Sequence, residues 1–397
     1  MPSKLSRRSL LGLLAAAPVL RPAYAGDWAS IAKEARGQTV YFNAWAGSEA
    51  INAYIAWAGQ QLLARHGVTL IHVKIADAAE VVRRVRDEVT AGVAQGSVDL
   101  VWINGENFRA MKQDRLLFGP FAEELPNFAA VDVHGKPTTL SDFAEPTGGF
   151  ESPWGMAQLT FFGDGAMIAK PPLSVMELIS FAKSNVGRVT YPAPPDFHGT
   201  TFLKQVLAET MADRTALGTA VEAKQFVAAA APMFAALDAL HPSLWREGKQ
   251  FPPTQAQVKQ MLADGELLMA LTFNPNEAAN LVASGALPRT TIAWQHRQGT
   301  IGNSHFVAIP VNARARAAAQ VTANFLLSAE AQARKADLAV WGDPTVLDMA
   351  KLKPAEAVLF HTGPQPGSVA YPAPAIPEPH ASWVPLIEAA WLKRYGA

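Results

Sequence analysis

The 397-residue chain contains no cysteine, and this absence excludes several kinds of chemistry. Without cysteine the protein has no disulfide, no thiolate nucleophile, no cysteine-ligated zinc and no lipid anchor on an N-terminal cysteine. A chain of this length can bury a hydrophobic core without disulfides. Hydrophobic residues make up 49% of the sequence and charged residues 17%, so we expect a large globular protein rather than a disordered one.

Long apolar runs are also scarce, and the one that stands out lies at the N-terminus. Basic residues precede an apolar stretch at 10–20, and an Ala-x-Ala pattern at 23–25 follows it. The stretch is too short to cross a bilayer, which takes about 20 apolar residues. We interpret residues 1–25 as a signal peptide cleaved near Ala25-Gly26, the alternative being a buried N-terminal helix. The mature protein is then exported, and is periplasmic in a cell with an outer membrane.

The paired arginines Arg7 and Arg8 bear on the export route. The segment Ser6-Arg7-Arg8-Ser9-Leu10-Leu11 resembles a twin-arginine signal, which directs folded proteins across the membrane. Phenylalanine is commoner than leucine at the position of Leu10 in such signals, so Sec-dependent export stays open.

Excess positive charge is missing from the mature chain. The segment 1–25 holds four of the 34 basic residues and no acidic one, which leaves 30 basic and 34 acidic residues and a net charge of −4. Nucleic acids and anionic lipids are bound by concentrated positive charge. We therefore expect no nucleic-acid partner.

Familiar catalytic motifs are absent as well. The sequence has no H-E-x-x-H, no G-x-S-x-G and no G-x-x-x-x-G-K-[ST], and Gly163-Asp164-Gly165 lacks the third glycine of a dinucleotide fingerprint. The nine histidines are scattered, and none are spaced like a metal-binding pair. We predict no catalytic residue, no metal site and no cofactor. An exported enzyme on the same scaffold remains the alternative.

What the sequence does contain is a regular alternation of strand and helix patterns. In the first part, β-type runs at 40–42, 68–75 and 98–103 are separated by helical patterns that begin near Ser48 and Asp77. Strands joined by helices imply right-handed crossovers and a parallel, doubly wound sheet. The fold class is therefore α/β.

The alternation restarts in the second part of the chain. A helical pattern at 174–185 is followed by a short predicted strand at 188–191, a proline-rich loop, further helices and a strand at 266–273. Two further runs, 154–162 and 301–310, have the pattern of strands that connect the two parts. The sequence thus predicts a second α/β unit, with a proline-rich C-terminal stretch that stiffens an ordered wrap.

Four segments carry a resemblance to a known family. They are Tyr41-Phe42-Asn43-Ala44-Trp45-Ala46-Gly47, Asp99-Leu100-Val101-Trp102-Ile103-Asn104-Gly105-Glu106-Asn107-Phe108, Pro153-Trp154-Gly155-Met156-Ala157-Gln158 and Tyr191-Pro192-Ala193-Pro194-Pro195-Asp196-Phe197. Together they resemble the YnjB-like group of ABC-transporter substrate-binding proteins, within the superfamily of polyamine-, thiamine- and iron-binding proteins. The chain has six tyrosines and no Tyr-Tyr pair, which argues against the phenolate cage of the ferric-binding relatives.

The resemblance implies a two-lobed periplasmic-binding-protein fold of type II. Each lobe is then a doubly wound, mainly parallel sheet, and two crossing strands join the lobes. We place lobe 1 at 26–152 plus 276–335 and lobe 2 at 153–275 plus 336–397. The implied function is the extracytoplasmic solute-binding component of an ABC importer: a monomer that traps a small molecule between its lobes and delivers it to a permease–ATPase complex at the inner membrane.

The candidate ligand-binding residues follow from where such sheets bind ligands. In open α/β sheets the ligand lies beyond the carboxyl ends of the strands, near helix N-termini. The residues at those positions are Trp45, Gly47, Ser48, Asn104, Glu106, Asn107, Trp154, Asp196, Phe197, Thr200, Thr201, Phe273, Asn274, Glu277, Trp341 and Asp343. Several have structural alternatives: Asp196 is equally suited to cap the helix after it, and Trp45 to pack in a core.

The same residues suggest a ligand class. Tryptophan and phenylalanine offer ring faces to a cation, and Glu106, Asp196, Glu277 and Asp343 offer counter-charge. The loops 41–48, 104–107, 196–201 and 273–277 contain no Lys or Arg. We predict a small cationic or neutral organic solute, thiamine-like or polyamine-like. The alternative is an anion held by helix N-termini.

Overall fold

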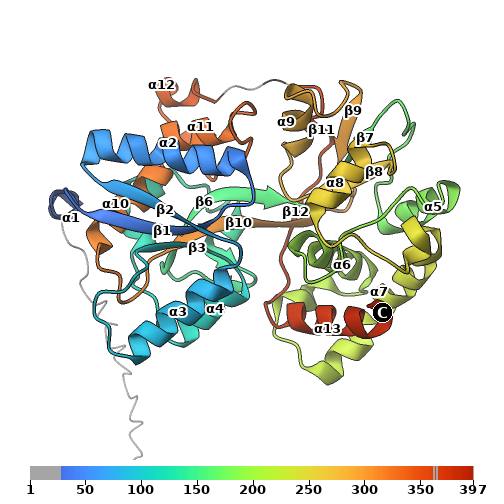
Figure 1. The fold of residues 1–397 in the computed structure, drawn as a ribbon, viewed down its shortest axis with the longest axis horizontal. Coiled ribbons are helices and arrows are strands. Elements are labelled where there is room, and N and C mark those ends of the chain that lie inside the picture. The colour runs from blue at the N-terminus through green and yellow to red at the C-terminus, as the bar shows by residue number, and fades with distance from the viewer. Residues whose placement is uncertain (1–27, 361–362, 364, 397) are drawn as a thin grey trace, which may run out of the picture.

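The chain forms two α/β lobes that lie next to each other (Figure 1). The structure is a computed structural model, and it describes residues 28–360, 363 and 365–396. The predicted signal peptide, its cleavage site and the twin-arginine motif lie outside the described residues. Within the described part, no helix is long and apolar enough to span a membrane.

The first lobe is built on a six-stranded sheet. Its strands run in the order β12-β10-β3-β1-β2, and β6 also pairs with β10. Their bounds are β1 (Thr39–Trp45), β2 (Thr69–Ile75), β3 (Leu100–Ile103), β6 (Glu151–Gln158), β10 (Thr300–Ala308) and β12 (Ala375–Pro377). Because β1 is parallel to both β2 and β3, the carboxyl ends of these three strands meet at one edge. In Figure 1 this edge faces the second lobe.

Helices cover both faces of this sheet, as a doubly wound fold requires. On one face, α2 and α10 pack over β1 and β2 through a core that includes Phe42, Tyr54 and Leu326. On the other face, α3 and α4 pack through Val85 and Phe108. The helices of this lobe are α1 (Trp28–Glu34), α2 (Glu49–His66), α3 (Ala78–Thr90), α4 (Glu106–Gln113), α10 (Arg316–Leu326), α11 (Ala329–Ala336) and α12 (Pro354–Ala357). A short hairpin of β4 (Ser141–Asp142) and β5 (Glu145–Pro146) completes it.

The second lobe has a four-stranded sheet in the order β11-β9-β7-β8. Strand β7 is antiparallel to both β8 and β9, and β9 is parallel to β11. The strands are β7 (Thr160–Asp164), β8 (Met269–Thr272), β9 (Thr291–Trp294) and β11 (Val369–Tyr371). The helices are α5 (Val175–Ser184), α6 (Phe197–Thr210), α7 (Ala223–Leu240), α8 (Gln255–Ala263), α9 (Glu277–Ala283) and α13 (Trp383–Tyr395). The two-lobed α/β fold is as predicted, but the sheet of the second lobe is mainly antiparallel rather than mainly parallel, because its central strand β7 runs opposite to both neighbours.

The lobe boundaries differ from the predicted ones in four places. Residues 153–158 of β6 and residues 375–377 of β12 belong to the first-lobe sheet. Residues 276–294 belong with the second lobe, because α9 packs in its core and β9 pairs with β7. Residues 336–360 belong with the first lobe, because Trp341 and Val346 are buried in its core.

The chain crosses between the lobes at Leu159, between β6 and β7, and at residues 295–299, between β9 and β10. It crosses again in its C-terminal part, between α12 and β11, between β11 and β12, and between β12 and α13. The predicted boundaries at 275/276 and 335/336 are misplaced because a strand that passes from one lobe to the other has the same sequence pattern as any other buried strand.

The predicted strand at 188–191 is not a strand. Its carbonyls accept isolated hydrogen bonds, from the Leu268 N–H to the Arg188 oxygen (2.9 Å) and from the Trp245 N–H to the Val189 oxygen (2.8 Å). No ladder forms, since these two donors come from different segments. The β-type pattern marks a buried extended segment rather than a member of the sheet.

The lobes also touch through side chains of α9. The Asn276 Nδ2 donates to the Gly342 oxygen at 2.7 Å, and the Asn280 Nδ2 donates to the Trp341 oxygen at 2.6 Å. Both carbonyls lie in the loop after α11, which belongs to the first lobe. These bonds fix one side of the interface between the lobes.

Candidate functional site

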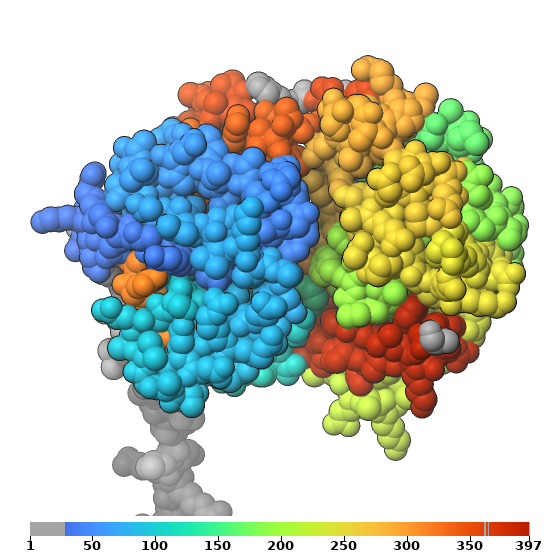
Figure 2. Space-filling view, in the orientation of Figure 1, coloured from blue at the N-terminus to red at the C-terminus, as the bar shows by residue number. Residues whose placement is uncertain are grey.

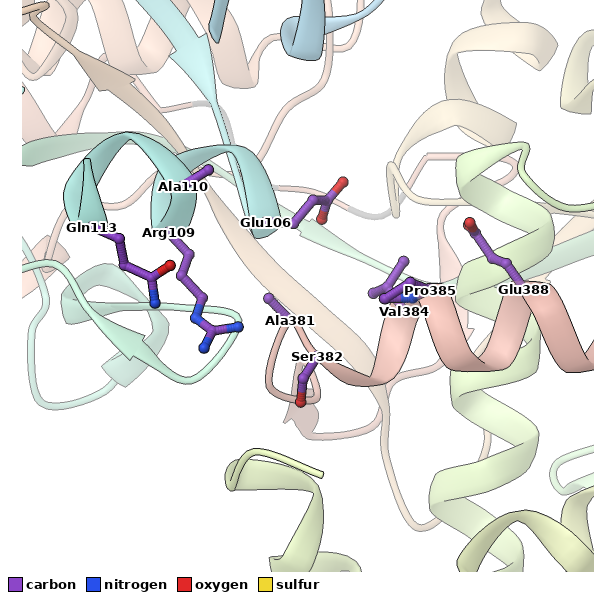
Figure 3. A pocket seen from close by; sticks show the side chains of 9 residues that line it. All are labelled: Glu106, Arg109, Ala110, Gln113, Ala381, Ser382, Val384, Pro385 and Glu388. Carbon is purple, nitrogen blue, oxygen red and sulfur yellow. The ribbon is translucent and has the colours of Figure 1, made fainter. Parts of the chain in front are cut away.

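A groove separates the two lobes on the face shown in Figure 2, and a pocket of about 310 Å³ lies within it. The pocket opens between α4 of the first lobe and the first half of α13 in the second (Figure 3). Its lining residues come from both lobes: Glu106, Arg109, Ala110, Gln113, Ala381, Ser382, Val384, Pro385 and Glu388. A pocket of this size can hold a small organic molecule.

The start of α4 is positioned by a carboxyl group behind it. The Asp142 Oδ2 accepts a hydrogen bond from the Gly105 N–H at 2.6 Å. Gly105 has φ of 61°, and the ring of Phe143 lies so close that an added Cβ would be 3.2 Å from it. Only glycine fits both conditions without strain. Burial raises the pKa of Asp142 well above its usual range, although the hydrogen bonds from Gly105 and Asn104 oppose the shift.

Two carboxylates point into the pocket from opposite lobes. Glu106, the first residue of α4, and Glu388 of α13 face the space between the helices in Figure 3. Among the described residues neither forms an ion pair with a lysine, arginine or histidine, and Glu388 accepts a hydrogen bond from the Thr200 Oγ1 at 2.7 Å. Arg109 lies on the same wall as Glu106.

The surroundings of Glu106 affect its ionisation. Desolvation between the lobes raises its pKa, although the side chain remains accessible to water within the pocket. The negative charges of Glu388 and Asp77 act in the same direction, and the positive charge of Lys204 acts against it. A cation between the two lobes would relieve this repulsion.

A buried lysine lies behind the pocket. The Lys204 Nζ, on α6, is 2.6 Å from the Glu378 Oε2, and the Asn303 Nδ2 donates to the other carboxylate oxygen at 3.2 Å. The same ammonium is 4.7 Å from the ring centre of Phe143 and 5.3 Å from that of Phe197. Burial raises the pKa of Glu378 even though the Lys204 ammonium opposes the shift.

The N-termini of α3, α4 and α6 carry their own negative charges, whereas the first turn of α13, which lines the pocket, has no acidic residue. Asp77 caps α3 by accepting from the Ala79 N–H, and Asp196 caps α6 by accepting from the N–H groups of His198 and Gly199. Glu106 lies in the first turn of α4. Since a carboxylate already occupies or neutralises the positive end of α3, α4 and α6, these three N-termini are poorly suited to bind an anion.

The structure brings part of the predicted site to the cleft. Glu106 lines the pocket, Phe197 is 43% exposed beside Lys204, and Thr200 holds Glu388. Trp45 is 42% exposed at the end of β1, where its ring folds back over Gly47 so closely that an added Cβ would be 2.2 Å away. Three further candidates lie at the carboxyl ends of β1 and β3 or just after them: Ser48, Asn104 and Asn107.

Three predicted aromatic residues are core residues instead. Trp154 and Trp341 are 0% and 5% exposed, and their rings lie 5.5 Å apart in the core of the first lobe. Phe273 is buried in the second lobe with its ring 5.1 Å from that of Phe197. The prediction placed these rings in the cleft because Trp154 begins and Phe273 ends a predicted strand, and Trp341 lies in a predicted loop. The rings of Trp154 and Trp341 instead pack in the core of the first lobe, and the ring of Phe273 packs in the core of the second.

Most of the other predicted polar residues are satisfied within the protein. The Asp196 carboxylate caps α6, and Glu277 pairs with Lys259. Asp343 is buried against Lys335 and accepts from His305, so it offers no free charge to a ligand. The Asn104 Nδ2 donates to the Ser304 oxygen at 2.7 Å, and the Asn274 Nδ2 donates to the Trp341 oxygen at 3.2 Å. The Thr201 side chain is fully buried.

Sequence reasoning missed four residues around the pocket: Phe143, Lys204, Glu378 and Glu388. The sequence could have indicated that Lys204 is buried, because this lysine lies in the apolar helical segment Thr201-Phe202-Leu203-Lys204-Gln205-Val206-Leu207. A buried lysine needs a partner for its charge. The other three lie in a short hairpin and in the C-terminal tail, where the pattern gives no sign that they approach the cleft.

A metal site is not apparent in this part of the protein. Within the residues that the structure describes, no group of three or more His, Asp or Glu side chains could hold an ion.

Comparison with known proteins identifies relatives of the whole chain. The sequence profile described as "Bacterial extracellular solute-binding protein" matches residues 57–359. Protein YnjB of Escherichia coli (strain K12) is similar to this chain at 48% identity over 388 residues, which covers 98% of both proteins.

Solved structures of lower sequence identity share the fold. The spermidine/putrescine ABC-transporter substrate-binding protein PotD of Streptococcus pneumoniae matches with a TM-score of 0.59 at 13% identity, covering 90% of this chain and 98% of PotD. The periplasmic binding protein AfuA of Actinobacillus pleuropneumoniae, with fructose-6-phosphate bound, also has a TM-score of 0.59, at 14% identity and with coverage of 90% and 99%. One fold thus accompanies ligands of opposite charge, so the ligand has to be argued from the site itself.

Proposed function

This chain belongs to the family of bacterial extracellular solute-binding proteins, and we propose that it binds a small cationic or neutral organic solute, thiamine-like or polyamine-like, between its lobes. The family is described as extracellular solute-binding, and PotD is named as the substrate-binding protein of an ABC transporter, which supports a binding role rather than catalysis. In our proposal the mature protein acts as a monomer outside the inner membrane. It passes its solute to a permease–ATPase complex.

The facing pair of Glu106 and Glu388 is the observation that carries this proposal. The two carboxylates come from different lobes, and neither has an ion-pair partner among the described residues. Two like charges that face a shared pocket repel each other, and a positive group placed between them removes the repulsion and contacts both lobes. Binding of a cation then favours the arrangement in which the lobes are together.

The alternative of an anionic solute has less support. Arg109 lines the pocket and would attract an anion, but the anion would also meet Glu106 and Glu388. The N-termini of α3, α4 and α6 carry acidic side chains at or next to their first turn, which makes them poor sites for phosphate or sulfate; only the start of α13, among the helices named here, lines the pocket without one. Exposed Phe197 and Trp45 add ring faces, which favour organic cations.

Calorimetry on the mature protein tests the ligand class. The panel contains thiamine, putrescine, spermidine, sulfate, phosphate and ferric ion. We expect one of the organic cations to bind, and Glu106→Gln and Glu388→Gln each to weaken it by about tenfold or more, as loss of a charged contact predicts. Glu34→Gln, on the far side of the first lobe in α1, is the matched control and leaves the affinity unchanged.

The melting temperature of the empty protein separates binding from folding. Because Glu106 is accessible to water and lacks an ion-pair partner, Glu106→Gln should leave that temperature nearly unchanged. Tight binding of sulfate or phosphate, or full affinity for the cation in both pocket variants, contradicts the proposal.

A further inference from the structure

The ammonium of Lys204 is enclosed by groups that proteins use to bind an ammonium ligand. Glu378 supplies a carboxylate 2.6 Å away, and Phe143 and Phe197 present their rings at 4.7 and 5.3 Å from the Nζ. We call these three residues the ammonium box. Carboxylate and aromatic faces together favour an organic cation, and here the cation belongs to the protein.

The ammonium box draws on both lobes. Phe143 follows the hairpin strand β4 in the first lobe, whereas Phe197 and Lys204 lie on α6 in the second. Lys204 is 1% exposed, so its charge is held in place rather than exchanged with solvent. Few buried lysines lack such partners, because burying an unpaired ammonium is costly.

The box adjoins the pocket. Thr200 and Lys204 are one helical turn apart on the same face of α6, and Thr200 is hydrogen-bonded to Glu388 in the pocket wall. The positive charge of Lys204 is also felt at Glu106. A ligand that lies between Glu106 and Glu388 therefore has the box beside it.

We propose that Lys204 fills a second ammonium subsite, so that the pocket selects solutes with one positive group over diamines. This inference rests on the proposed function and narrows it, because it favours the thiamine-like solute over the polyamine-like one. The charges agree with it: Glu106 and Glu388 contribute two negative charges to the pocket and Arg109 one positive charge, which leaves one negative charge for the ligand to neutralise. A second ammonium finds the box occupied and is repelled by Lys204.

The test compares two amines of matched length, butylamine and 1,4-diaminobutane, which differ only in the second ammonium. For the wild-type protein we expect the diamine to bind no more tightly than the monoamine. Lys204→Ala empties the box and leaves Glu378 available, so the diamine should then bind at least tenfold more tightly than the monoamine. Lys204→Met removes the charge but keeps the volume, and should show no such gain.

A second measurement keeps the test decisive if Lys204→Ala folds poorly. Propylammonium has the three carbons and the ammonium that this variant lacks. We expect propylammonium chloride to raise the melting temperature of Lys204→Ala, or to restore its folding, more than sodium chloride at equal concentration. Lys204→Met should not respond in this way. This readout needs no pocket ligand, so it is independent of the proposed function.

The outcomes separate the two proposals. The inference about Lys204 is wrong if the wild-type protein binds the diamine tenfold more tightly than the monoamine. It is also wrong if Lys204→Ala shows no gain in diamine affinity and no response to propylammonium. If the wild-type protein binds no organic cation while Lys204→Ala still responds to propylammonium, the proposed function fails and the ammonium box stands.

Discussion

His241 should make the second lobe sensitive to mild acid. This histidine is 5% exposed and lies among Tyr191, Phe251 and Tyr395. The Trp391 Nε1 donates to the Tyr191 hydroxyl oxygen at 2.9 Å, and that hydroxyl is 2.7 Å from the His241 Nε2. Because an indole N–H can only donate, the Tyr191 oxygen accepts from Trp391, and its own hydrogen is available to the His241 Nε2 when that nitrogen is unprotonated.

Protonation of His241 breaks this arrangement, since it places a second hydrogen between the two groups. Burial lowers the pKa of His241 to about 4 from 6.5, with attraction from Asp238 opposing the shift and repulsion from Arg394 adding to it. The unfolded chain therefore binds a proton more readily than the folded one between these values. Stability is complete above about pH 6.5 and is lost as the pH falls towards 4. The difference of about 2.5 units corresponds to about 3 kcal/mol in total, of which about 2 kcal/mol is lost between pH 7 and pH 5.

His241→Gln provides the comparison, because an amide oxygen can accept the Tyr191 hydrogen bond but does not titrate. The free energy of unfolding is measured by urea denaturation from pH 7 to pH 4.5 for both proteins. We expect the wild-type value to fall by about 2 kcal/mol more than that of the variant by pH 5. Contributions from other groups are common to both proteins. Parallel pH profiles for the two proteins would show that the reasoning about His241 is wrong.

Two further predictions concern a buried ion pair and export. The Asp343 carboxylate is buried against Lys335 and accepts a hydrogen bond from the His305 Nε2 at 3.0 Å. Burial alone would raise the pKa of Asp343, but Lys335 and His305 hold that pKa below its usual value. Asp343→Asn leaves the Lys335 ammonium buried without its counter-charge, so unfolding in urea should show a loss of about 3–5 kcal/mol, whereas a loss below about 1 kcal/mol contradicts the role of the pair. For export, Arg7→Lys combined with Arg8→Lys should block appearance of the mature protein in the periplasm if the twin-arginine route is used. Unchanged periplasmic yield points to Sec, and N-terminal sequencing should find Gly26 or a residue next to it.

The fold was predictable because its signals are local. The runs at 68–75 and 98–103 are rich in Val, Ile and Leu, and the residues after them start helices with recognisable caps such as Asp77. These signals also place Glu106 at the carboxyl edge of the sheet. Edge position follows from strand order, which the alternation of strand and helix largely determines.

The details of the site were less predictable because they depend on contacts between distant segments. Trp154 lies within β6 and Trp341 in the loop after α11, and both rings pack inside the first lobe. Glu378 and Glu388 lie in a tail whose prolines predict an ordered wrap but not its path. Lys204 meets Phe143 only when the two lobes come together. No periodicity in the sequence reports such a contact.

The position of α13 couples the pocket to the core of the second lobe. This helix packs on α6 and α7 through the buried side chains of Trp383, Ile387 and Trp391, while its first half lines the pocket with Glu388. Removal of residues 381–396 would therefore take away one wall of the proposed pocket and three core side chains of the second lobe at the same time. Recognition of the proposed solute and folding of the second lobe thus depend on the same helix.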